Sequence, residues 1–298
     1  MLVRDGRAGL HDLGPLAEAA RLVRWHRFGL RRLITTGDSA AARAGVEHAA
    51  AALDSQLFDP LRRHLAGRPL VIVPVGALHD VGWAGLPTCA GRAITVAPSA
   101  TVWLGADQRE APVGPPVLAS GPRLPAGQAE VHRLTRVLPG ARLFTGADAT
   151  ADALTAALDG AGLVHIAAHG TFRADNPQFS TLELADGPLF AYEWERIARP
   201  PGCVVLSACE SGLTGVRPGD EVMGFTAVLL ALGAKCLIAT VLPVPAEPTT
   251  ALVLDLHQRM RAGARPAQAL AHAQRAFGAS GDSTARATAA AFVCLGAG

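Results

Sequence analysis

Two residues whose side chains could act together in catalysis each stand at the end of a short apolar run. Cys209 ends the run "VVLSAC", and His169 ends the run "LVHIAAH". A thiol is only partly ionised near neutral pH, and a neighbouring imidazole favours the thiolate and can protonate a leaving amine. The pair predicts nucleophilic attack on a carbonyl, with the backbone N–H groups of Gly170 and Cys209 as an oxyanion site.

We interpret the other cysteines as small residues of the hydrophobic core. The same interpretation stays open for Cys209, which could be a core residue at a strand end. The count of five is odd and no C-x-x-C pair occurs, so a disulfide framework and a zinc site are not expected. The thiol chemistry itself needs no metal or organic cofactor. The four cysteines expected to be structural are Cys89, Cys203, Cys236 and Cys294.

Strand geometry decides which histidine can lie near Cys209. With a rise of about 3.3 Å per residue, His165 and His169 are roughly 13 Å apart, so only one can lie at the strand end. We therefore expect His165 to be a hydrogen-bonded core histidine. The runs that end in His169 and Cys209 are joined by a helix-containing connection, which predicts parallel neighbouring strands. Their carboxyl ends then meet at the sheet edge where ligand sites form.

The rest of the chain alternates short apolar runs with helical patterns, which predicts an α/β sandwich around a mostly parallel sheet. We expect a helical segment at residues 1–66, a first half of the α/β domain at 67–115, and a second half with the Cys/His site at 116–298. Strands are predicted within 68–76, 93–99, 115–122, 141–146, 161–170, 203–209, 234–244 and 290–298, with a hairpin at 180–190. Helices are predicted in two stretches of 14–66 and within 128–138, 149–158, 191–198, 219–233, 248–263 and 266–277.

Composition limits the partners and the compartment. Half of the 298 residues are hydrophobic, and the net charge is +2, so neither a nucleic-acid nor a membrane partner is indicated. The apolar run Val222–Pro245 contains Gly233 and Lys235, and we interpret it as a buried helix followed by a buried strand. With no signal peptide evident, we expect a cytoplasmic protein. The amphipathic helices of residues 14–66 are expected to pack on the following domain, with a docking surface as the alternative.

Several motifs, in order, resemble one family. The stretches "HIAAHGTFRADNPQF", "VVLSACESG" and "GDEVMGFTAVLLALGAKCLIATVLPV" are similar to the CHAT domain, and the chain looks most like its actinobacterial branch. This family is caspase- and separase-like, belongs to clan CD of the cysteine peptidases and occurs beside tetratricopeptide repeats. The resemblance implies a caspase-haemoglobinase-like α/β sandwich with a degenerate first half and an active second half.

The resemblance also implies roles for individual residues. The family's catalytic histidine and cysteine fall on His169 and Cys209, and the residue that lines the pocket for the first substrate side chain falls on Ser207. Asp220 and Glu221 match the family's "GDE" and would add negative charge, which suggests a basic residue before the cleaved bond. A third catalytic residue stays open, with three candidates: Asp175, Asp186 and Glu210.

These features predict a cysteine endopeptidase that acts on protein or peptide substrates. A tetratricopeptide-repeat protein or another regulatory partner would activate it. The alternatives are a non-catalytic CHAT scaffold or signalling module, and a different thiol chemistry such as acyl transfer. The chain departs from the family in a loop where Pro243 replaces a usual Trp and Ala246 a usual Asp, with Glu247 as a substitute acid.

Overall fold

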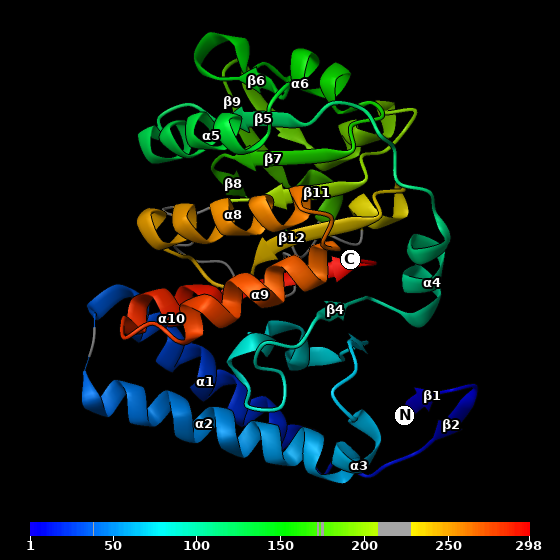
Figure 1. Ribbon diagram of the computed structural model, residues 1–298, viewed down its shortest axis with the longest axis vertical. Helices are drawn as coiled ribbons and strands as arrows, with labels where there is room; N and C mark the ends of the chain where they lie inside the picture. The colour runs from blue at the N-terminus through cyan, green and yellow to red at the C-terminus, as the bar shows by residue number, and fades with distance from the viewer. Residues whose placement is uncertain (38, 172, 174–175, 208–227) are drawn as a thin grey trace.

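The computed structural model describes residues 1–37, 39–171, 173, 176–207 and 228–298 (Figure 1). One eight-stranded sheet runs through the molecule, and among its described strands every neighbouring pair is parallel except β12 with β13. A mostly parallel α/β fold is therefore confirmed. In spatial order the strands are β3 (Leu70–Ile72), β4 (Ile94–Val96), β13 (Phe292–Gly296), β12 (Cys236–Thr240), β11 (Cys203–Leu206), β7 (Leu163–Ala167), β5 (Val117–Ser120) and β6 (Arg142–Phe144).

Helices cover both faces of this sheet. On one face lie α5 (Pro125–Val137), α8 (Ala246–Arg261) and α9 (Pro266–Gly278), which cross in front of the strands in Figure 1. There Leu118 and Ala167 pack with α5 side chains in one apolar cluster. Val164 and Ile166 have the opposite strand parity and belong to the larger core cluster, which includes α6 (Ala151–Leu158). This alternation is the expected pattern for strands buried on both faces.

The N-terminal segment is helical, as predicted. A short hairpin, β1 (Leu2–Arg4) and β2 (Arg7–Gly9), precedes α1 (Leu16–Thr36) and α2 (Ala40–Phe58). Ser39 begins α2, since its hydroxyl accepts a hydrogen bond from the Ala42 N–H. After α2 the chain makes two single turns, η1 (Asp59–Leu61) and α3 (Arg62–Leu65). One side of α1 packs on α2 and on α10 (Ser283–Ala291), which confirms the packing interpretation for this helix.

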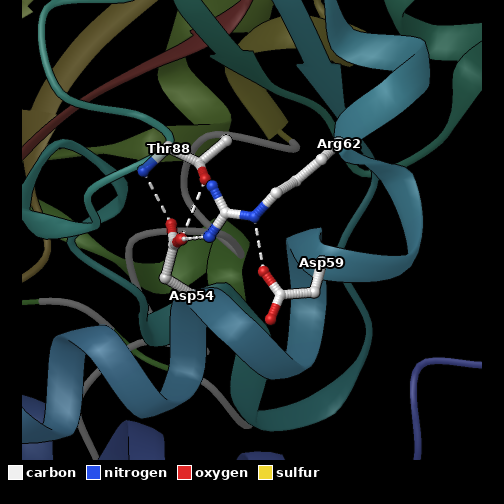
Figure 2. Close-up of polar contacts among 4 residues, drawn as sticks. All are labelled: Asp54, Asp59, Arg62 and Thr88. Carbon is white, nitrogen blue, oxygen red and sulfur yellow. Dashed lines mark hydrogen bonds and ion pairs between the residues drawn. The ribbon is translucent and has the colours of Figure 1, made fainter.

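A polar cluster ties α2 to the segment before β4 (Figure 2). The buried Asp54 carboxylate accepts hydrogen bonds from the Thr88 N–H (2.7 Å) and the Thr88 hydroxyl (2.8 Å). Arg62 donates to the same carboxylate at 3.2 Å and also pairs with the exposed Asp59. A buried carboxylate is expensive unless it is paired and hydrogen-bonded, and Asp54 meets that requirement.

Some elements were not predicted, or differ in their bounds. The closing strand was expected from Ala290, but α10 extends to Ala291 because its alanines favour a helix that Asp282 caps. The predicted helix at 191–198 is a 3₁₀ helix, η6 (Ala191–Arg196). The unpredicted elements are the hairpin strands β1 and β2, α4 (Ala100–Gln108), η2 (Gly76–Asp80), η3 (Trp83–Gly85), η4 (Gly146–Asp148) and η5 (Pro177–Phe179).

The long apolar run at residues 222–245 lies partly outside the described residues. The chain is helical at 228–231 and then forms β12, so the predicted strand is confirmed. Among the helices of the described ranges, none combines the length and the apolar character that a membrane crossing requires. The division at residues 67 and 116 stays a prediction, and both predicted halves contribute strands to the same sheet.

Candidate functional site

Strands β7 and β11 lie side by side and run parallel, as the connection between them predicted. Their register pairs Leu163 with Cys203 and Ile166 with Leu206. Every pair is therefore forty residues apart in the sequence. The Ser207 N–H extends the ladder by donating to the Ile166 carbonyl oxygen at 2.9 Å. The carboxyl ends of the two strands consequently lie at the same edge of the sheet.

His169 lies just beyond the end of β7. The strand was expected to continue to His169, but it ends at Ala167, and Ala168 and His169 form a link to β8 (Gly170–Thr171). The chain leaves the main sheet here because β8 pairs with β9 (Thr181–Leu184) in a separate three-stranded sheet, completed by β10 (Gly187–Phe190). His169 is partly exposed, and its carbonyl oxygen accepts a hydrogen bond from the Glu183 N–H at 2.8 Å.

The pairing of β8 with β9 determines the direction of the Gly170 N–H. Gly170 is opposite Leu182, and the flanking residues His169 and Glu183 make the backbone hydrogen bond. Gly170 and Leu182 are therefore a non-hydrogen-bonded pair, in which the N–H and C=O groups of Gly170 point away from β9. This N–H is therefore not used by the β8–β9 ladder.

The remaining predicted site residues are only partly described. Ser207 follows β11 directly and its side chain is buried, with 4% of the residue exposed. Cys209, Asp220 and Glu221 lie outside the described residues, as do two of the candidates for a third catalytic residue, Asp175 and Glu210.

Two other acidic candidates have defined positions. Asp186 lies in the hairpin between β9 and β10, and its carboxylate accepts a hydrogen bond from the Ala151 N–H at 2.9 Å. Asp186 therefore caps α6. Glu247 is exposed in the first turn of α8, where an acidic side chain suits the helix dipole.

The second histidine of β7 has a different environment. His165 is fully buried, and its Nε2 is 2.9 Å from Oε1 of Glu130 on α5. Its Nδ1 is 3.0 Å from Nε2 of His257 on α8, and the Thr250 hydroxyl donates to Oε2 of Glu130 at 2.9 Å. The prediction of a hydrogen-bonded core histidine is confirmed. The partners come from α5 and α8, more than thirty residues away, so strand periodicity could not identify them.

Burial decides the protonation of His257. Desolvation lowers the pKa of His257 well below its ordinary value, and the neighbouring His165 lowers it further. His257 is therefore neutral at pH 7. This buried network, formed by Glu130, His165, Thr250 and His257, links the middle of β7 to two helices.

The four cysteines predicted to be structural are all buried. Burial raises the pKa of the Cys89 thiol to about 12. The pKa of Cys203 is raised well above its ordinary value, first by its contact with Cys236 and then by burial. Such thiols are protonated at neutral pH and react slowly. The structural interpretation of these four residues is therefore supported by both their burial and their surroundings.

The mostly parallel sheet, the reversal at β13 and the helices on both faces form an α/β sandwich. The CHAT domain family profile matches residues 47–297, and the chain belongs to the CHAT domain family. No curated protein sequence matches the chain.

Solved structures with a similar fold include a separase–securin complex and a cysteine proteinase. Separase from Saccharomyces cerevisiae, bound to securin, superimposes with a TM-score of 0.56 at 13% identity; the match covers 81% of this chain and 16% of that one. The pro- and mature domains of RgpB from Porphyromonas gingivalis give 0.55 at 12% identity, covering 94% and 76%. Gingipain R (RgpB), described as an Arg-specific cysteine proteinase, gives 0.50 at 10% identity, covering 94% and 74%. At these identities the likeness establishes the fold alone.

Proposed function

We propose that this protein is a cysteine endopeptidase with Cys209 as the nucleophile and His169 as its partner. The observation that carries the proposal is the register of β7 and β11. Paired residues are forty apart, and His169 and Cys209 are also forty apart in the sequence. The register therefore brings the end of β7, at Ala167 just before His169, beside the end of β11, at Leu206 just before the segment that contains Cys209. Membership of the CHAT family supports the same two residues, since the motifs "AAHG" and "SACES" that contain them resemble the family's histidine and cysteine motifs.

In the proposed reaction the Cys209 thiolate attacks the carbonyl carbon of the scissile peptide bond. The oxyanion that forms accepts hydrogen bonds from the N–H groups of Gly170 and Cys209. His169 donates a proton to the leaving amine, and a water molecule then hydrolyses the thioester. The direction of the Gly170 N–H, away from the β8–β9 ladder, supports its part in this step.

Substrate recognition is proposed at Ser207, Asp220 and Glu221. The two acidic residues would favour a basic residue before the cleaved bond. Ser207 is 4% exposed, so a substrate side chain can reach it only after whatever covers it is displaced. This burial supports the further proposal that a protein partner, such as a tetratricopeptide-repeat protein, or a ligand must activate the enzyme.

The test is a series of peptides with a thiol-reactive group and a varied first residue, applied to the wild type, Cys209→Ala and His169→Ala. We expect covalent labelling of the wild type, strongest with Arg or Lys in the first position, and none of Cys209→Ala. Cys89→Ala is the matched control, since it removes a buried thiol elsewhere and should label like the wild type. Labelling that persists in Cys209→Ala would contradict the proposal, and complete absence of labelling with intact folding would favour the non-catalytic scaffold.

A further inference from the structure

A second cavity opens at the sheet edge opposite the proposed catalytic residues. Its volume is about 550 Å³, within the range of about 300–1,000 Å³ found for small-molecule sites. The first residues of three parallel strands line it: Leu163 of β7, Cys203 of β11 and Cys236 of β12. The end of α8 and the start of α9 form its side, with Met260 and Pro266 among the lining residues.

The topology of the sheet explains why a cavity forms there. Strand direction reverses between β12 and β13, so the carboxyl end of β13 lies beside the amino end of β12. Ala297, which follows β13, and Ala264, in the α8–α9 connection, both line the cavity. The small side chains at these positions leave the space unfilled.

The interior of the cavity is apolar and polarisable. Leu138, Leu163 and Met260 contribute apolar surface, and Cys203 and Cys236 add sulfur atoms. The Cys236 sulfur lies 3.4 Å from that of Cys294, behind the lining. Protonated thiols and a thioether contact hydrocarbon favourably, so this surface suits an aliphatic chain rather than a polar group.

The rim, in contrast, is mostly cationic. Lys235, Arg261 and Arg265 line it, with Asp107 as an opposing acidic side chain. The Lys235 ammonium donates to the backbone carbonyls of Asp107 and Arg109, contacts that leave its charge uncompensated. Arg261 and Arg265 are exposed, and neither has an ion-pair partner among the residues that the structure describes. Two guanidinium groups at the mouth of an apolar cavity favour a carboxylate there.

We propose that this cavity binds a small amphipathic carboxylate, with its aliphatic tail against Leu163, Met260 and the cysteine sulfurs and its carboxylate between Arg261 and Arg265. The site is separate from the proposed peptidase site, and its occupancy does not depend on Cys209. It lies at the amino ends of the strands whose carboxyl ends lead to His169 and Cys209.

Isothermal titration calorimetry of the full chain with octanoate, octanol and acetate tests the site. Octanol retains the tail without the charge, and acetate retains the charge without the tail. We expect saturable binding of one octanoate per chain, at least tenfold tighter than either control ligand, because both parts of the site contribute. The proposal would be overturned if octanol bound as tightly as octanoate, or if octanoate binding did not saturate. Neither outcome requires a variant of the protein.

A double variant locates the site. Arg261→Glu with Arg265→Glu should weaken octanoate binding at least tenfold, since the carboxylate would then meet two like charges. Arg31→Glu with Arg32→Glu is the matched control, because it makes the same charge change at exposed positions of α1 that are not part of the cavity. Equal affinity of the cavity variant and the control would show that octanoate binds elsewhere. We expect Cys209→Ala and the wild type to bind octanoate with equal affinity. This result would keep the test of the cavity separate from the test of the peptidase.

Discussion

His165 and His169 come from the same stretch of chain, four residues apart, and have opposite environments. His165 lies inside β7, is fully buried, and has both ring nitrogens within hydrogen-bond distance of buried partners. His169 lies past the strand end, is partly exposed, and is next to a glycine whose N–H faces away from the local ladder. The difference shows that two histidines four residues apart acquire different environments because one lies within the strand and the other lies past its end.

The largest effect expected from this comparison is on stability at Glu130. Glu130→Ala removes the carboxylate that holds His165 and leaves a buried imidazole and the Thr250 hydroxyl without their partner. Each buried polar group left without its partner costs about 1–3 kcal/mol, and this change leaves two of them. Urea unfolding should show this loss, whereas His169→Ala should change the free energy of unfolding by about 1 kcal/mol or less. Equal losses in the two variants would remove the distinction between the two histidines.

Lowering the pH should reduce the free energy of unfolding, because the protein contains buried neutral histidines. Burial lowers the pKa of His26 to about 4 and lowers that of His257 well below its ordinary value. The unfolded chain therefore takes up protons first as the pH falls below about 6.5, and stability present above that pH is lost progressively. For His26 the loss is complete near pH 4 and amounts to roughly 3 kcal/mol. Unfolding free energies measured between pH 7 and pH 4 check this.

His26→Leu sharpens the same test. Both His26 ring nitrogens are buried, and neither has a hydrogen-bond partner among the residues that the structure describes. Leucine should therefore be tolerated at pH 7, and the variant should lose less stability than the wild type between pH 6.5 and pH 4. An unchanged pH dependence in this variant would mean that His26 does not contribute to acid unfolding.

Asp54 and Asp59 extend the contrast to carboxylates that share one arginine. Both contact Arg62, but Asp54 is buried with two further hydrogen bonds from Thr88, and Asp59 is exposed (Figure 2). Asp54→Ala should cost about 1–3 kcal/mol, since it leaves a buried N–H and a hydroxyl unpaired. Asp59→Ala should cost less than about 1 kcal/mol, as is usual for a surface ion pair. Thermal unfolding of the two variants gives the comparison directly.

The sequence predicted the features that depend on local patterns. Strand periodicity identified β7 and β11, and the helix-containing connection between them correctly predicted that they are parallel neighbours. Ser39 and Thr150 each precede a helical run and accept a hydrogen bond from the N–H three residues later, as is usual for a hydroxyl residue at a helix start.

Features that depend on distant contacts were not predictable in this way. Glu130 and His257 join His165 only after α5 and α8 pack on the sheet. The early end of β7 follows from the pairing of β8 with β9, a separate sheet whose existence apolar periodicity does not indicate. The cavity at the opposite edge arises from the reversal at β13, which depends on the order of strands in space.

The central claim is that His169 favours the thiolate of Cys209, and the pH dependence of thiol alkylation tests it without a substrate or an activator. The four other cysteines are buried, so iodoacetamide should label Cys209 selectively in the folded protein. We expect the labelling rate of the wild type to rise with an apparent pKa clearly below the ordinary thiol value of about 8.5, and that of His169→Ala to rise near 8.5. The same apparent pKa in both proteins, or no labelling of Cys209, would contradict the claim.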